Sequence, residues 1–133
     1  MAITQGAHHI GLTVPSIEDT RDFFINVLEF NQVGEVPNYP AYFISDGTVM
    51  LTLWQAADPG KATPFDRKNN IGLHHLALKV KDIDTLNHIY QTLIKTEEVR
   101  IEFAPELSGS GPAQHLMAYI PGGIRLELMA AGR

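Results

Sequence analysis

The sequence predicts an α+β fold in which tandem βαβββ modules form a cup-shaped mixed sheet with the helices on the outside. Two observations lead to this prediction. The run at residues 8–14, HHIGLTV, recurs almost half a chain later at residues 74–80 as HHLALKV, and the same order of helical and strand-like segments follows each copy. Such a repeat indicates a duplicated architecture, because one module alone is too small to bury its own sheet.

The elements of each module follow in the same order. Residues 7–14 and 73–80 are rich in Ile, Leu and Val in an alternating pattern, which is typical of strands. A helix is expected after each strand, with Ser16 and Asp82 as the N-cap residues. The apolar stripes of the two helices are expected at Ile17, Phe24 and Leu28, and at Leu86, Ile89, Tyr90, Leu93 and Ile94.

Three strand-like runs complete each module. They cover 31–36, 40–46 and 48–55 in the first half, and 99–104, 114–120 and 124–130 in the second. Turns are expected at Asp46-Gly47 and at Pro121-Gly122-Gly123. We therefore expect a single domain over residues 1–133, made of modules at about 5–56 and 71–131. The segment at about 57–70, rich in Pro, Gly and Asn, is expected to be a surface linker between them.

Composition narrows the function classes. The chain has 133 residues, 44% hydrophobic residues, no cysteine and a formal net charge of -5. The absence of cysteine favours a cytoplasmic location and excludes a zinc site built from thiolates. The acidic balance gives no field that would attract nucleic acid, and neither a signal peptide nor a membrane span is visible. A small molecule is the expected partner, with neither nucleic acid nor membrane bound.

Two imidazoles and one carboxylate suggest a metal site. His9 and His75 occupy the same position of the repeat, and Glu127 lies on the polar side of the last strand, together with Arg125 and Met129. Side chains alternate along a strand, so that His8 should point away from His9, and His74 away from His75. His9, His75 and Glu127 on one concave sheet would match a facial triad, which holds one divalent ion and leaves positions open for substrate.

Alternation along the expected strand 114–120 predicts two further residues in the cup. His115 and Tyr119 should share the face of Met117, and His115 could serve as a general acid or base near neutral pH. A surface histidine beside a loop is the equally weighted alternative for His115. Trp54 could contribute an apolar wall, although aromatic residues in strands are more often part of the core.

These residues resemble the vicinal oxygen chelate superfamily, which includes glyoxalase I, extradiol dioxygenases, fosfomycin-resistance transferases and bleomycin-resistance proteins. The resemblance covers the whole chain and rests on the two His-His openings and the closing run YIPGGIRLEL at 119–128. It implies His9, Thr52, His75 and Glu127 as the four positions at which the family places metal ligands. It also implies one divalent ion (Fe2+, Mn2+, Ni2+, Co2+ or Zn2+), a substrate held through two neighbouring oxygens, and a homodimer.

Thr52 departs from the glyoxalase I pattern, in which a carboxylate at this position serves as ligand and base. Met117 stands where extradiol enzymes carry a tyrosine, and Arg125 is the one obvious cation for the phosphonate of a fosfomycin transferase. The resemblance therefore implies either a lyase or isomerase, or a ring-cleaving dioxygenase, with Thr52, Trp54, Met117 and Arg125 as candidate pocket residues. The alternatives are a metal-free drug-sequestering protein, a thiol transferase of the fosfomycin type, and a scaffold that binds metal without turnover. The sequence leaves open whether His9 and His75 meet within one chain or across a dimer.

Overall fold

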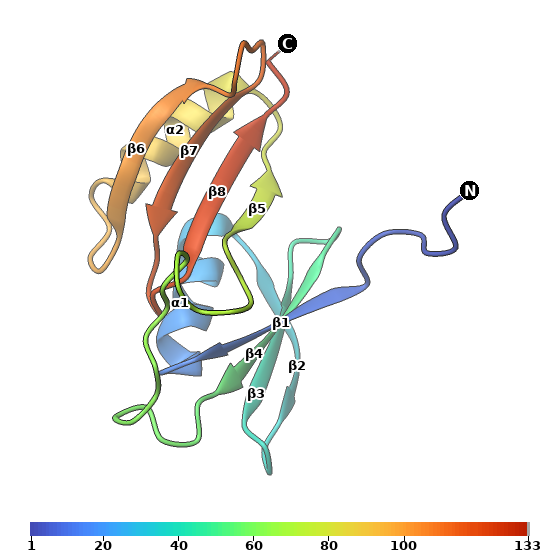
Figure 1. Ribbon diagram of the computed structural model, residues 1–133, viewed down its shortest axis with the longest axis vertical. Helices are drawn as coiled ribbons and strands as arrows, with labels where there is room; N and C mark the ends of the chain where they lie inside the picture. Colours follow the sequence, from blue (N-terminus) through green and yellow to red (C-terminus); the bar gives the residue numbers. More distant parts are fainter. Residues whose placement is uncertain (133) are drawn as a thin grey trace. The chain divides into compact units, whose positions relative to one another are not determined.

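The computed structural model describes residues 1–132, and these divide into two compact units, Met1–Thr63 and the residues from Pro64 onward. Each unit contains one helix and a four-stranded mixed sheet, so that the predicted α+β fold with two βαβββ repeats is confirmed (Figure 1). The boundary between the units falls within the segment 57–70.

The first unit is built from five elements, which are β1 (His9–Val14), α1 (Ile17–Leu28), β2 (Asn31–Val36), β3 (Ala41–Ser45) and β4 (Met50–Gln55). Its sheet has the strand order β1-β4-β3-β2, in which β1 is parallel to β4 and the other pairs are antiparallel. Helix α1 packs on β2, β3 and β4. The strand residues that point toward the helix include Ile44, Leu51 and Leu53, which are fully buried.

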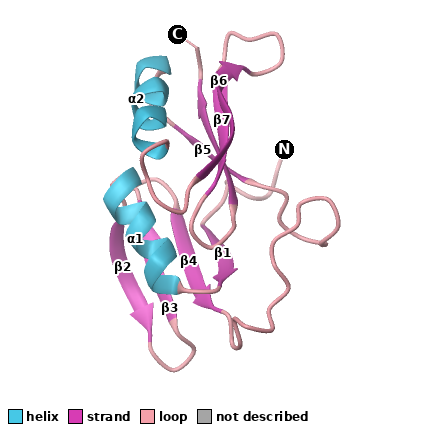
Figure 2. Ribbon diagram, turned by 90° about the vertical axis from the view of Figure 1, so that its left-hand side faces the viewer, coloured by secondary structure: helices cyan, strands magenta, loops and turns pink. Residues whose placement is uncertain are grey.

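The second unit repeats this order with β5 (Leu76–Lys79), α2 (Ile83–Leu93), β6 (Arg100–Leu107), β7 (Gln114–Tyr119) and β8 (Arg125–Ala130). The strand order is β5-β8-β7-β6, again with one parallel pair, between β5 and β8. Each helix lies along one side of its own sheet (Figure 2). In this unit Leu116, Leu126 and Leu128 form the core under α2, and alternation turns Arg125 and Glu127 to the opposite face of the sheet.

Local signals fixed most element boundaries. Ser16 accepts a hydrogen bond from the Asp19 N–H (3.2 Å), as expected of an N-cap. Both predicted turns form, since Gly47, Gly122 and Gly123 adopt positive φ angles that other residues rarely reach. Glu29 ends α1 in the left-handed conformation, and this places the Phe30 ring 5.0 Å from the ring of Phe24.

Two expectations about the second unit need correction. Ile94 was expected on the apolar stripe of α2, but the helix ends at Leu93 and Ile94 is the C-cap residue, with 48% of its surface exposed. A new turn begins there, in which Lys95 and Thr96 donate to the carbonyls of Thr92 and Leu93. Strand β6 was expected to end at residue 104. It continues to Leu107, because its pairing with β7 resumes after two register irregularities.

The Asp82 cap yields a stability prediction. Its carboxylate accepts from the Thr85 hydroxyl (2.6 Å) and the Thr85 N–H (2.8 Å), and these bonds hold the pKa of Asp82 below its ordinary value of 3.8. Asp82→Ala is expected to lower Tm by about 2–5 °C at neutral pH. The lowered pKa makes this stabilisation present above pH 3.8 and lost as the pH falls through the folded-state value, so the difference in Tm should shrink in acid.

Thermal melts of the parent and of the Asp82→Ala variant across this pH range test the prediction. Asp82→Asn keeps a side-chain acceptor and is the matched control, expected to melt close to the parent. Equal Tm values for the parent and Asp82→Ala at neutral pH would contradict the assigned role of the cap.

Candidate metal and substrate site

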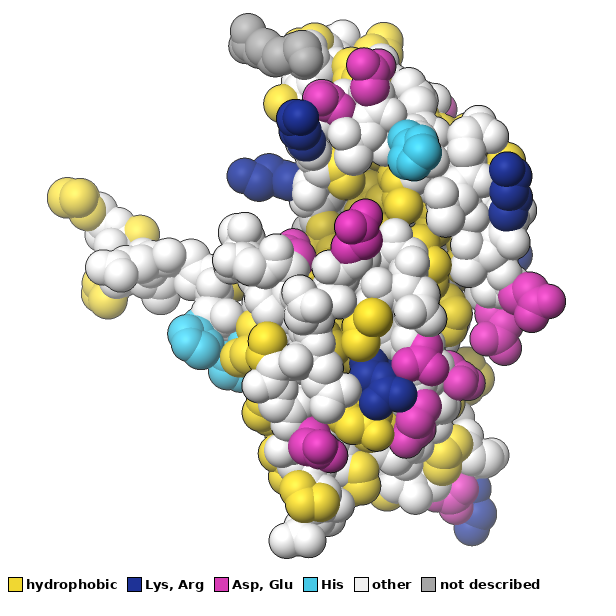
Figure 3. Space-filling view, turned by 180° about the vertical axis from the view of Figure 1, so that it is seen from behind, with side chains coloured by type: hydrophobic (Ala, Val, Ile, Leu, Met, Phe, Trp, Pro, Cys, Tyr) yellow, Lys and Arg dark blue, Asp and Glu magenta, His cyan; other side chains and the backbone are white. Residues whose placement is uncertain are grey.

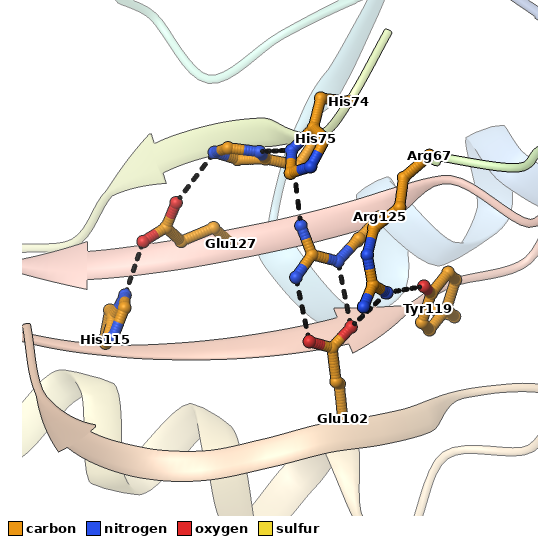
Figure 4. Close-up of polar contacts among 8 residues, drawn as sticks. All are labelled: Arg67, His74, His75, Glu102, His115, Tyr119, Arg125 and Glu127. Atoms are coloured by element: carbon orange, nitrogen blue, oxygen red, sulfur yellow. Dashed lines mark hydrogen bonds and ion pairs between the residues drawn. The ribbon is translucent and has the colours of Figure 1, made fainter. Parts of the chain in front are cut away.

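A buried carboxylate, that of Glu127, lies on the face of the second sheet opposite to α2. Only 6% of the Glu127 surface is exposed, and each of its oxygens meets an imidazole. His75 Nε2 lies 3.1 Å from Glu127 Oε1, and His115 Nδ1 lies 2.5 Å from Oε2 (Figure 4). Burial of an unpaired carboxylate costs free energy. The contacts with His75 and His115 offset this cost for Glu127.

Strand register explains why the three side chains meet. Met117 of β7 is directly opposite Glu127 of β8, and His115 is opposite Met129, one step of alternation further along the same face. His75 stands immediately before β5, which runs parallel beside β8. The structure thus brings the predicted residues His75, His115 and Glu127 together, with Met117 buried among them at the same face of the sheet.

The spacing of two donor atoms in the second unit suits a divalent ion. Adjacent ligands of an octahedral ion with bonds of about 2.1 Å are separated by about 3.0 Å, and the atoms His75 Nε2 and Glu127 Oε1 are 3.1 Å apart. Imidazole and carboxylate are both ligands that such ions accept. Within residues 1–132, no group of three or more His, Cys, Asp or Glu side chains is arranged so that it could hold a metal ion. The second unit therefore offers two adjacent ligands that fit the ion.

The expectation that neighbouring histidines point in opposite directions is wrong. His8 Nδ1 lies 2.9 Å from His9 Nδ1, and His74 Nδ1 lies 2.7 Å from His75 Nδ1. The reason is that alternation holds only within extended strand. His8 precedes the first residue of β1 and lies in a bend, and both His74 and His75 precede β5.

A second polar cluster lies beside the first, and sequence reasoning missed three of its members, Glu102, Arg67 and Arg100. Glu102 of β6 accepts two hydrogen bonds from Arg125, each of 2.8 Å, and a third from Arg67 at 3.0 Å (Figure 4). Arg67 also donates to the Tyr119 hydroxyl (2.5 Å), and the guanidinium of Arg100 lies 4.2 Å from the centre of the Tyr119 ring. The cluster holds three cations around one carboxylate.

Electrostatics in this cluster follow from the contacts. Hydrogen bonds from Arg125 hold the pKa of Glu102 below its ordinary value of 4.5, and the positive charges of Arg125, Arg67 and Arg100 act in the same direction. The bonds to Glu102 likewise raise the pKa of Arg125 above its ordinary value. Arg125, a predicted pocket residue, is thus committed to an ion pair. The N–H groups of Lys68 and Asn69 donate to Asp66 Oδ1, so that Arg67 lies in a turn formed around the Asp66 carboxylate.

In the first unit, Thr52 and Trp54 contact each other. Thr52 is 3% exposed, and its hydroxyl accepts a hydrogen bond from Trp54 Nε1 (2.9 Å). The indole also meets the rings of Tyr39 and Phe43, at centroid distances of 4.8 and 6.1 Å. Gly11 leaves room for this pair, since a Cβ there would lie 3.2 Å from Thr52 Oγ1. His9 opens the same sheet from β1, paired with Met50.

The Thr52 contact can be tested with the single tryptophan of the chain. Thr52→Val removes the acceptor for Trp54 Nε1–H and is expected to lower the free energy of unfolding by about 1–2 kcal/mol. It should also shift the tryptophan emission maximum, which reports on the environment of the indole. Thr48→Val, at an exposed position of the β3–β4 turn, is the control. An unchanged spectrum and unchanged stability in Thr52→Val would show that the hydrogen bond contributes nothing.

The face drawn in Figure 3 carries Lys and Arg side chains singly and among Asp and Glu, without a continuous basic area. None of the described helices is long and apolar enough to cross a membrane. His88 is an exposed residue of α2, the helix that packs on the face of the second sheet opposite to Glu127.

Comparisons with known proteins agree with this architecture. The profile of the Glyoxalase/Bleomycin resistance protein/Dioxygenase superfamily matches residues 6–128. A glyoxylase/bleomycin resistance protein/dioxygenase domain from Frankia sp. superposes with a TM-score of 0.82 at 19% identity, with 96% of this chain and 93% of that chain covered. No curated protein shows significant similarity in sequence.

Two further solved structures illustrate the range of activities found on this fold. Lactoylglutathione lyase from Agrobacterium tumefaciens has a TM-score of 0.70 at 18% identity, with coverage of 98% of this chain and 97% of that chain. A genomically encoded fosfomycin resistance protein from Listeria monocytogenes has a TM-score of 0.70 at 16% identity, with coverage of 96% and 94%. At these identities the likeness establishes the fold alone.

Proposed function

The chain belongs to the Glyoxalase/Bleomycin resistance protein/Dioxygenase superfamily, and we propose that it is a divalent-metal-dependent enzyme that binds a small substrate through two neighbouring oxygens. The observation that carries this proposal is the buried Glu127 carboxylate with His75 Nε2 at 3.1 Å. In the proposal these two residues supply two ligands, and His9 of the first unit, at the same position of the repeat, supplies the third. The reaction is of the lyase or isomerase type or is a ring-cleaving dioxygenation.

The chain's own residues have distinct roles in this proposal. The bound ion would stabilise negative charge on the substrate oxygens, a contribution commonly worth several kcal/mol. His75 and Glu127 would hold the ion. His115, through its Nδ1 contact with Glu127 Oε2, orients the carboxylate and keeps Nε2 available to exchange a proton with the substrate. Tyr119 is the other candidate for proton transfer. Its oxygen accepts from Arg67, so its own proton can be offered to an acceptor on the substrate.

Elemental analysis of protein purified without a metal-affinity tag tests the site. The parent is expected to contain about one divalent ion per site. His9→Ala, His75→Ala and Glu127→Ala should each lose it, and His88→Ala, which removes an exposed histidine on α2, should retain it. Undiminished metal in all three ligand variants would overturn the assignment. Parent protein without any metal, after incubation with each candidate ion, would favour the metal-free drug-sequestering alternative.

Mixing variants distinguishes a site within one chain from a site shared by two. The superfamily resemblance implies a homodimer. If His9 and Glu127 of different chains share an ion, dimers mixed from His9→Ala and Glu127→Ala chains should regain about half of the parent metal. If each chain builds its own site, the mixed dimers should bind no metal.

The choice of reaction depends on the ion and on oxygen. Oxygen consumption by iron(II)-loaded protein with a panel of catechols would indicate ring cleavage, whereas turnover without oxygen in the nickel, cobalt, zinc or manganese form would indicate a lyase or isomerase. One further candidate is thiol transfer to a phosphonate. Such a substrate needs several cations, and Arg67 and Arg125 would have to exchange Glu102 for the phosphonate to serve it. Conversion of fosfomycin in the presence of a thiol, followed by phosphorus NMR, tests this candidate directly.

A further inference from the structure

A row of polar residues crosses the second sheet on the face opposite to α2. Tyr119 of β7 is paired with Arg100 of β6 on one side and with Arg125 of β8 on the other. Directly paired residues of neighbouring strands point to the same face of a sheet, so that both arginines lie beside Tyr119. Arg67 joins them from the segment before β5 and donates to the Tyr119 hydroxyl (Figure 4). Tyr119 thus lies among three cations.

These cations share a single carboxylate. Glu102 pairs with Arg125 Nη2 at 2.8 Å and with Arg67 Nη1 at 3.0 Å. The guanidinium of Arg100 lies instead over the Tyr119 ring, 4.2 Å from its centre, and within residues 1–132 it forms no ion pair. Positive charge is therefore in excess at this end of the sheet, although the formal net charge of the chain is -5.

The architecture does not require cations at these positions. In the first unit the corresponding row, which begins beside His9, consists of Met50, Ser45 and Asn31. These residues are neutral, and the sheet that contains them has the same strand order as the second sheet. A sheet of this topology thus forms without arginines in the row, and this points to a ligand as the reason for the positive charge in the second unit.

Two of the three arginines retain open hydrogen-bond donors. Both hydrogen bonds of Arg67 use Nη1, and among the described residues no acceptor meets its Nε or Nη2. The Arg100 guanidinium is held by the ring alone, with all of its N–H groups open in the same part of the chain. The planar fork of an arginine matches the two oxygens of a carboxylate. The Tyr119 hydroxyl, whose oxygen accepts from Arg67, can donate its own proton as well.

We propose that Arg67, Arg100 and Tyr119 bind a carboxylate of the ligand, while Glu102 stays paired with Arg125. A carboxylate needs no more than the open donors of two arginines. A tetrahedral dianion would also call on Arg125, which Glu102 holds with two hydrogen bonds of 2.8 Å. The Tyr119 proton then serves binding, and proton transfer is left to His115.

The carboxylate site narrows the substrate class, an extension that rests on the proposed function. Tyr119 is paired with Arg125 and Met117 with Glu127, so that the rows of Tyr119 and Glu127 are two residues apart. This separation is about 7 Å along the strands. The substrate would therefore be a carboxylic acid whose carboxylate lies at about this distance from the two oxygens that the ion binds.

Titration of the 15N-labelled full chain with sodium benzoate tests the carboxylate site. Metal is first removed by dialysis, so that benzoate meets no ion. The Nε–H resonances of Arg67 and Arg100 should shift and reach saturation in NMR spectra. Benzamide, which has nearly the same shape without the charge, and inorganic phosphate at equal ionic strength should leave both resonances in place. Saturation by phosphate but not by benzoate would overturn the proposed ligand class, and shifts with benzamide would overturn recognition of the charge.

Variants of single residues locate the binding energy. Arg100→Gln, at an exposed position, should weaken benzoate binding about tenfold, as is usual when one charged hydrogen bond is lost. Tyr119→Phe keeps the ring under Arg100 and should weaken it about threefold to tenfold. Arg21→Gln is the matched control, because Arg21 also lies over a ring, that of Tyr42 at 4.3 Å, but is paired with Asp22. It should bind benzoate as the parent does. Equal affinity in Arg100→Gln and the parent would refute the site.

Metal analysis of the same preparations before dialysis separates this inference from the proposed function. A parent that binds benzoate but holds no ion, even after incubation with each candidate ion, would refute the proposed function and leave the carboxylate site standing. A parent that holds the ion but shows no saturable shift with benzoate would refute the carboxylate site and leave the proposed function standing.

Discussion

Glu102→Gln is expected to lower the free energy of unfolding by about 2–3 kcal/mol, because it leaves the guanidinium of Arg125 buried without its counter-charge. The Arg125 side chain is 9% exposed and that of Glu102 is 23% exposed. Breaking a fully buried pair costs about 3–5 kcal/mol, and the partial exposure of Glu102 reduces this figure. Urea denaturation at constant m-value measures the change. Asp22→Asn, which breaks the exposed pair with Arg21, should stay within about 0.5 kcal/mol of the parent.

The same pair makes stability depend on pH. Arg125 lowers the pKa of Glu102 below 4.5, so the pair stabilises the fold above this value and the contribution is lost as the pH falls through the folded-state pKa. Glutamine does not titrate. The stability curves of the parent and of Glu102→Gln should therefore converge in acid, and a difference that stays constant from neutral pH to pH values well below 4.5 would mean that the loss has another cause.

Phe24→Ala is expected to cost about 3–5 kcal/mol, the range typical of a buried aromatic side chain that is truncated to a methyl group. The ring is fully buried on α1 and meets the rings of Phe23 at 5.5 Å and Phe30 at 5.0 Å. Phe24→Leu refills part of the volume and should lose about half as much. Val33→Ala, at a position that is 58% exposed, should change stability by less than about 0.5 kcal/mol.

Unfolding followed by Trp54 fluorescence locates the effect of Phe24→Ala. Trp54 and Phe24 belong to the first unit, so the fluorescence transition of this variant should move to lower urea. A transition at the parent midpoint would show that α1 contributes little to the stability of its sheet.

The repeat made the fold readable, since the sequence carries each element twice. The prediction was wrong at positions where contacts with a neighbouring segment outweigh the local sequence pattern. Ile94 fits the apolar periodicity of α2, yet the chain turns before it. His8 and His74 fit the alternation of a strand, yet the strands begin after them. Periodicity describes residues inside an element and carries little information about the residue at which the element starts or ends.

Part of the candidate site could be predicted from the sequence, because some of its residues lie inside regular strands. Alternation placed His115 and Glu127 on one face, because β7 and β8 are regular and fully paired. Glu102 could not be placed, since it stands at a register irregularity in β6, between Ile101 and Phe103. Arg67 could not be placed either, because it belongs to the irregular segment before β5 and reaches Glu102 and Tyr119 across a gap of 35 and 52 residues.

The sequence by itself determined the duplicated α+β architecture and the face of β8 that carries Glu127. Tertiary structure alone decided that His75 and His115 meet opposite oxygens of Glu127, and that Arg125 is paired with Glu102 rather than free for a substrate. The physical reason is that periodicity assigns a side chain to a face, whereas a hydrogen bond depends on register, on bulges and on loops that no local pattern encodes.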